Sequence, residues 1–112
     1  MHLNFYCLKN CDTCRKALKA LENAGHTVSV TDIRKDGVPA QVLAEALAGL
    51  GQEKFLSTRS PTWKTLSDTE KAGDPVQLML AHPTLMKRPL IMGENWVSAG
   101  WSKDVAAALT GT

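Results

Sequence analysis

The sequence has few aromatic residues, no marked excess of either charge and no long apolar run. Phe, Trp and Tyr make up 5% of the 112 residues, and 13 Lys and Arg face 11 Asp and Glu, for a net charge of +2. This near balance argues against a dedicated nucleic-acid binder, which concentrates basic residues. No segment approaches the ~18 apolar residues of a membrane helix, and the amino end shows no signal peptide. We therefore expect one globular domain over residues 1–112, monomeric and without direct contact to nucleic acid or membrane.

The cysteine content is small and unevenly distributed. Three cysteines lie close together near the amino end, at Cys7, Cys11 and Cys14. An odd number does not suggest a secreted disulfide framework, so a cytoplasmic protein with reduced thiols is expected. A zinc site would need a second ligand pair, and the three histidines are scattered singly. We therefore expect no metal and no bound cofactor.

The first third of the chain predicts a strand, a helix and a second strand. Alternating apolar residues predict a strand over residues 3–7, with Leu3, Phe5 and Cys7 on one face. A helical period follows from Thr13, and Gly25 is placed to end that helix. Residues 27–31 then alternate as a strand, with Val28 and Val30 expected to face inward.

The rest of the chain predicts helices followed by a hairpin and a last helix. An apolar stripe over residues 42–50 predicts a helix ended by Gly49 and Gly51. Residues 52–74 are polar and predicted to be irregular, apart from a helical turn near 63–66. A third helix over 76–80 precedes His82-Pro83. Strands over 90–92 and 96–98 flank a turn, and Ser102 caps a final helix.

This order is the topology of a thioredoxin-like core. A βαβ unit followed by ββα predicts an α/β fold with a mixed four-stranded sheet. The residues from about 36 to 86 form a helical insertion between the two halves.

Cys11-Asp12-Thr13-Cys14 is a Cys-x-x-Cys motif at the junction between the first strand and the first helix. Asn10 or Asp12 is expected to cap the helix, which places Cys11 at its positive end, where a thiolate is stabilised. Lowering a thiol pKa from ~8.5 to ~6 takes ~3.4 kcal/mol. A helix terminus supplies ~0.3–1 kcal/mol, so nearby cations must supply the remainder. Cys11 is the candidate nucleophile, whereas Cys14 is either a resolving thiol or a small buried hydrophobe. Cys7 is expected in the core.

Two arginines are the candidate cations. Arg59 lies in a loop-like Ser-Thr-Arg-Ser-Pro segment, where an arginine is usually only solvated. Arg88 precedes Pro89, at the point where thioredoxin-like folds carry a cis-proline beside the cysteine. Guanidinium groups suit oxyanions, so Arg88 and the helix N–H groups predict an anion pocket next to Cys11.

These residues resemble the glutaredoxin-linked arsenate reductase family, which includes the Spx-type regulators and the YffB-like proteins. The resemblance rests on residues 9–16, on Thr58-Arg59-Ser60 and on the block from His82-Pro83 to Arg88-Pro89. It runs from about Leu3 to the last helix and is greatest for the YffB-like branch.

The resemblance implies a mechanism and a set of site residues. It implies that Cys11 attacks an oxyanion bound by Arg59 and Arg88, with glutathione as co-substrate and glutaredoxin regenerating the thiol. Substrate-binding residues would be Lys9, Asn10, Thr13 and Pro89. The arsenate reductases also carry a third arginine after the last strand, where this chain has residues 97–102 without one. They often have serine at the position of Cys14, whereas a cysteine there resembles Spx.

Two functions therefore remain as hypotheses. The first is a glutathione-dependent thiol oxidoreductase with an arsenate-reductase-like site. The second is an Spx-like regulator that binds the α subunit of RNA polymerase and uses a Cys11–Cys14 disulfide as a redox switch.

Overall fold

A mixed four-stranded sheet organises the chain. The computed structural model describes residues 2–8 and 11–111. The strands are β1 (His2–Cys7), β2 (Thr27–Asp32), β3 (Leu90–Gly93) and β4 (Trp96–Ala99), in the order β2-β1-β3-β4. β1 runs parallel to β2 and antiparallel to β3, and β3 pairs antiparallel with β4. The predicted mixed sheet is confirmed.

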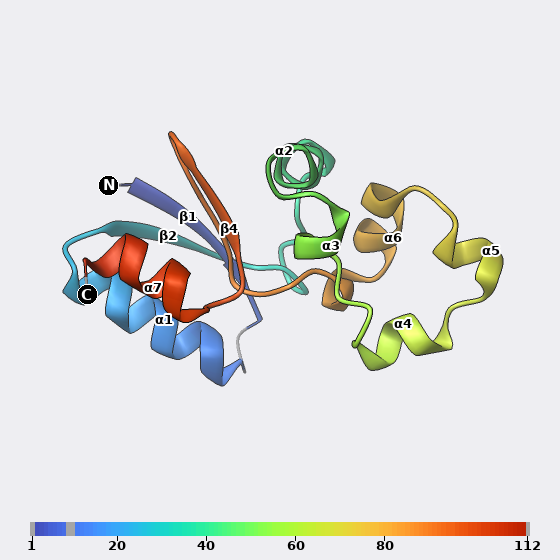
Figure 1. Cartoon of the computed structure of the whole chain (residues 1–112), viewed down its shortest axis with the longest axis horizontal. Coiled ribbons are helices and arrows are strands. Elements are labelled where there is room, and N and C mark those ends of the chain that lie inside the picture. The colour runs from blue at the N-terminus through green and yellow to red at the C-terminus, as the bar shows by residue number, and fades with distance from the viewer. Residues whose placement is uncertain (1, 9–10, 112) are drawn as a thin grey trace.

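β1 is buried along one face and, at Tyr6, also on the other, because an apolar cluster lies on each side of the sheet. Leu3, Phe5 and Cys7 pack in one apolar cluster together with residues of α1 (Asp12–Asn23) and α7 (Lys103–Thr110). Tyr6 points to the opposite face and joins a second cluster with residues of the helical insertion. α1 and α7 lie side by side under the sheet, whereas the insertion extends away from it (Figure 1). Successive strand side chains point to opposite faces, so β1 connects the two clusters.

The edge strand β2 differs from the sequence prediction at one position. Val28 is half-buried against the cluster that contains Leu3, whereas Val30 lies on the same face of the sheet but is 51% exposed. β2 has a hydrogen-bonded neighbour only on the side of β1, so its other flank is open to solvent. The alternation of apolar and polar residues therefore predicted the strand correctly, but not the exposure of Val30.

The chain between β2 and β3 is helical throughout most of its length. It holds α2 (Ala40–Leu50), α3 (Gln52–Phe55), α4 (Pro61–Thr65), α5 (Asp68–Lys71), α6 (Pro75–Ala81) and the 3₁₀ helix η1 (Pro83–Leu85). Residues 52–74 were expected to be irregular apart from one turn, and this prediction was wrong. Short helices form because local caps start them: the Ser60 hydroxyl accepts from Thr62 N–H, and Ser67 and Glu70 form a reciprocal capping box.

Of the two glycines predicted to end α2, only Gly51 does so. Gly49 lies inside the helix, and Gly51 ends it with φ +83°, a conformation that favours glycine. Gly49 has a packing role instead, because a Cβ built there would lie 2.7 Å from Cγ1 of Val97 in β4. The missing side chain therefore allows α2 to approach the sheet closely.

Candidate functional site

Cys11 is itself the N-cap of α1. Its backbone is extended (φ −88°, ψ 115°), and its sulfur accepts a hydrogen bond from the N–H of Cys14 at 3.4 Å. The expectation that Asp12 caps this helix was wrong, because Asp12 is its first helical residue; Asn10 lies outside the described residues. A side chain that accepts from the third helical N–H occupies the cap position, and here the acceptor is sulfur. The half-buried Cys11 thiol thus sits at the positive end of the helix, as predicted.

Cys14 faces the core from the first turn of α1. It is 2% exposed and packs in the cluster that contains Phe5 and Cys7. Burial raises the pKa of Cys14 to about 12, reinforced by its hydrogen bond with the Cys11 side chain and by the charge on that sulfur. The Cys14 thiol is therefore protonated at neutral pH. Its placement fits both interpretations of Cys14, because the side chain is a core residue that also contacts Cys11.

Cys7 is buried at the end of β1, as expected for a core residue. Burial raises the pKa of Cys7, and a hydrogen bond with the Cys14 side chain partly opposes this. All three cysteines are free thiols. Among residues 2–8 and 11–111, no three His, Cys, Asp or Glu side chains are placed to hold a metal ion.

A cavity of about 630 Å³ opens in front of Cys11, and we call it the cysteine cavity. Cys11, Thr13, Arg59 and Arg88 all line it, although they come from three distant parts of the sequence. The fold therefore brings together the nucleophile candidate and both arginine candidates. Lys9 and Asn10 lie outside the described residues, so their predicted role in binding is neither supported nor opposed.

Arg88 is the most informative residue of the cysteine cavity. Its peptide bond to Pro89 is cis, as predicted, and Pro89 lies buried behind it rather than along the cavity wall. Nη1 of Arg88 is buried and has no hydrogen-bond partner among the described residues. Burying a charged donor without a partner is costly, so such groups usually serve a ligand or water. The accessible part of the Arg88 side chain lines the cavity and is suited to bind an anion there.

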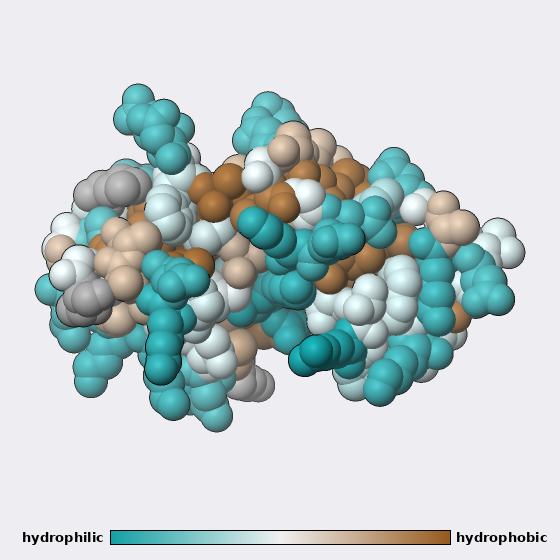
Figure 2. Space-filling view, viewed as in Figure 1, coloured by the Kyte–Doolittle hydropathy of each residue, from teal (hydrophilic) through white to brown (hydrophobic). Residues whose placement is uncertain are grey.

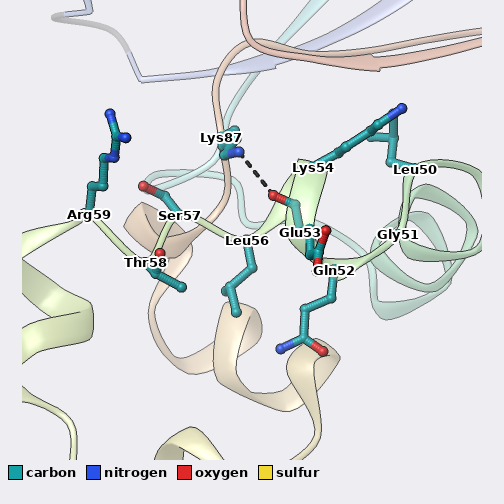
Figure 3. A pocket seen from close by; sticks show the side chains of 10 residues that line it. All are labelled: Leu50, Gly51, Gln52, Glu53, Lys54, Leu56, Ser57, Thr58, Arg59 and Lys87. Atoms are coloured by element: carbon teal, nitrogen blue, oxygen red, sulfur yellow. Dashed lines mark hydrogen bonds between the residues drawn. The ribbon is translucent and has the colours of Figure 1, made fainter.

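Arg59 reaches the same cavity from the loop before α4. Its side chain is exposed and extends away from α3 (Figure 3). The next residue, Ser60, caps α4 and thereby fixes the end of this loop. Arg59 is thus anchored through its backbone, while its guanidinium is free to reorient toward a ligand.

Sequence reasoning missed Lys87. This lysine also lines the cysteine cavity, and its Nζ donates to the carbonyl oxygen of Glu53 at 3.0 Å (Figure 3). The available signal was its position directly before Arg88-Pro89. Arg59, Lys87 and Arg88 supply three cations, and no Asp or Glu is among the described residues that line the cavity. The site is therefore suited to an anion.

The cavity wall after β4 carries no cation. Gly100 occupies this position, directly after the last strand, and the following residues hold no arginine. The resemblance to arsenate reductases implies that they have a third arginine at this point, and the sequence of this chain lacks it. The structure shows that the cavity wall at this point is a glycine.

Comparison with protein-family models matches residues 6–109 to the family described as ArsC. The chain belongs to the ArsC family. Two relatives illustrate its range. An uncharacterized protein of Haemophilus influenzae is 32% identical over 111 residues, covering 95% of this chain and 97% of the relative. The global transcriptional regulator Spx of Listeria innocua is 26% identical over 107 residues, covering 91% of this chain and 82% of the regulator.

Solved structures agree with this membership of the ArsC family. A protein named YFFB superposes with a TM-score of 0.85 at 27% identity, covering 96% of this chain and 98% of that one. A possible arsenate reductase from Streptococcus mutans superposes with a TM-score of 0.75 at 27% identity, covering 90% and 92%. These likenesses confirm the predicted α/β thioredoxin-like fold and the predicted family. No helix of the described residues is long and apolar enough to cross a membrane.

Proposed function

We propose that this ArsC-family chain is a thiol-based reductase that uses Cys11 as its nucleophile and glutathione as its co-substrate. The observation that carries the proposal is the convergence of Arg59, Arg88 and Cys11 on one cavity that has no Asp or Glu among its described lining residues. Guanidinium groups that share a cavity with a thiol are suited to hold an anionic substrate or leaving group next to the sulfur.

The proposed cycle begins with the Cys11 thiolate. It attacks a sulfur of the substrate disulfide, a Cys11–substrate bond forms, and the displaced thiolate takes up a proton. Glutathione then attacks the Cys11 sulfur of this mixed disulfide, so that the substrate leaves as a thiolate that takes up a proton and glutathione stays bonded to Cys11. A glutaredoxin thiolate attacks the glutathione sulfur of this adduct, which transfers glutathione to glutaredoxin and releases the Cys11 thiolate. Arg88 and Arg59 stabilise the negative charge on the departing group. This cycle operates where thiols are kept reduced, as in the cytoplasm expected from the cysteine content.

Disulfides are favoured over arsenate as the substrate. Arsenate carries two negative charges. The resemblance implies that arsenate reductases have an arginine after the last strand, whereas the wall of the cysteine cavity in this chain has Gly100 there. Each missing charge-assisted hydrogen bond costs about 1.5–3 kcal/mol of binding. An assay with arsenate, glutathione and glutaredoxin should therefore show much weaker turnover than one with a glutathione mixed disulfide.

Mass spectrometry after treatment with glutathione disulfide tests the proposal. We expect one glutathione adduct on Cys11 in the wild-type protein and in Cys14→Ala, and none in Cys11→Ser. Loss of the mixed-disulfide reductase activity in Cys11→Ser should be complete. A Cys11→Ser variant with normal activity would contradict the proposed function.

An Spx-like redox switch is the second candidate. It is favoured by the contact between the side chains of Cys14 and Cys11 and by the similarity to Spx regulators. In this case oxidation would yield an internal Cys11–Cys14 disulfide instead of a glutathione adduct. Binding of the RNA polymerase α subunit to the reduced and the oxidised protein distinguishes the two candidates. Absence of binding in both states would exclude the switch.

A further inference from the structure

A second cavity adjoins the cysteine cavity along α3. It measures about 1000 Å³ and is lined by Leu50, by residues 51–54 and 56–59, and by Lys87 (Figure 3). Ser57, Arg59 and Lys87 line both cavities, so the two are adjacent. Hydrophilic side chains cover the surface over α3 and toward the loop before α4, whereas hydrophobic ones gather over α2 (Figure 2).

The two adjacent cavities, which we call the groove, offer more space than a small inorganic anion occupies. A pocket of about 300–1,000 Å³ is usual for a drug-sized ligand, and the two cavities together are larger. An oxyanion bound by Arg88 would contact only the end near Cys11. The second cavity would then have no role in the reaction, although it shares Arg59 and Lys87 with the first.

The charge of the groove defines the kind of ligand. Lys54 adds a fourth cation to Arg59, Lys87 and Arg88, and Glu53 is the only acidic residue among the described residues that line either cavity. Lys87 is fixed by its hydrogen bond to the Glu53 carbonyl oxygen, whereas Lys54 is exposed at the far cavity. A cleft with one sign of charge attracts ligands of the opposite sign.

We propose that the groove binds an extended acidic polypeptide segment whose disulfide-bonded cysteine is presented to Cys11. This inference rests on the proposed function and names its substrate class: a protein disulfide rather than an oxyanion or a tripeptide alone. In the step itself the Cys11 sulfur bonds to the peptide sulfur, the original disulfide breaks, and the released thiolate takes up a proton. The acidic residues beside that cysteine lie along Lys54 and Lys87.

A pair of synthetic peptides tests the inference. Each has about eight residues, which span about 26 Å when extended, and carries a central cysteine in a mixed disulfide with 2-mercaptoethanol. One peptide has Asp and Glu around the cysteine, and the other has Asn and Gln. A third peptide is an acidic tripeptide. The second-order rate of disulfide consumption by the wild-type protein is followed by mass spectrometry.

We expect the acidic eight-residue peptide to react at least fivefold faster than its amide counterpart and faster than the tripeptide. Lys54→Glu should remove most of this preference, because it slows the reaction of the acidic peptide more than the reaction of the amide peptide. Lys19→Glu makes the same charge change on an exposed position of α1 outside both cavities, and it should retain the preference. The melting temperature of each variant verifies that it folds.

The possible failures are distinguishable. If none of the peptides reacts with Cys11, the proposed function itself is wrong. Equal rates for the acidic and amide peptides, or equal effects of Lys54→Glu and Lys19→Glu, would contradict the docking groove while the reductase activity stands. A tripeptide that reacts as fast as the longer acidic peptide would show that the second cavity does not contribute.

Discussion

The N–H of Cys14 donates to the sulfur of Cys11 across the first turn of α1, over 3.4 Å. A hydrogen bond to the charged form of a group stabilises that form. Proline at position 14 would remove this N–H, and the first turn of a helix tolerates proline. We expect Cys14→Pro to slow alkylation of Cys11 by iodoacetamide at pH 7 by about three- to tenfold relative to Cys14→Ala.

Cys14→Ala is the matched control for this experiment, because it removes the same thiol but keeps the N–H. Both variants should melt cooperatively, which is checked by circular dichroism. Equal alkylation rates in the two variants would show that the Cys14 N–H does not stabilise the thiolate.

The unpartnered Nη1 of Arg88 predicts opposite effects on stability and activity. Arg88→Met keeps a long side chain and removes a partly exposed guanidinium whose buried Nη1 lacks a hydrogen-bond partner, and one such unsatisfied donor costs about 1–3 kcal/mol. We expect the free energy of unfolding in urea to stay equal or rise by about 1 kcal/mol, while reductase activity falls at least tenfold. A loss of more than 1 kcal/mol would indicate that Arg88 is structural.

The close approach of Gly49 to Val97 leads us to expect that alanine at position 49 destabilises the protein, although it lies in a helix. Alanine normally stabilises a helix by about 1 kcal/mol relative to glycine. Here the new Cβ would lie 2.7 Å from Cγ1 of Val97 and force α2 away from β4. Gly49→Ala should therefore lower the free energy of unfolding by about 1–3 kcal/mol.

Val97→Ala provides the test of that explanation. It removes the methyl group that clashes, so the double variant should be more stable than the sum of the two single effects predicts. Strict additivity in urea denaturation would mean that the Gly49 contact is not the cause.

One buried tyrosine and two buried cysteines should make the stability of the fold sensitive to alkaline pH. Burial raises the pKa of Tyr6, of Cys7 and of Cys14. In the unfolded chain, cysteines lose their protons near pH ~8.5 and tyrosine near ~10, so above these values the folded state binds more protons. The free energy of unfolding should therefore be constant from pH 7 to 8 and fall as the pH rises further.

Urea denaturation at pH 7, 8, 9 and 10 measures this decline. Each thiol contributes at most about 1.4 kcal/mol per pH unit, and Cys14→Ala should reduce the slope. A stability that does not change up to pH 10 would contradict the raised pKa values.

The helical insertion illustrates how local signals can be overlooked. The capping box of Ser67 and Glu70 and the Ser60-Pro61 start are readable from the sequence, yet residues 52–74 have no apolar period long enough to predict helices of four or five residues. The exposure of Val30 could not be predicted from the alternation of apolar and polar residues, because this pattern does not reveal whether a strand lies at the edge of a sheet.

The sequence by itself determined the βαβ and ββα halves and the position of Cys11 at a helix start, because periodicity and motif spacing are local. The cis-proline after Arg88 was expected only from its place in a thioredoxin-like fold. Only the tertiary structure decided that Arg59, Lys87 and Arg88 meet Cys11 in one cavity. That convergence depends on how the insertion folds back through the bridge between Leu56 and Met86, a contact between residues thirty positions apart. Such long-range pairing is set by packing of the whole chain, and no local pattern encodes it.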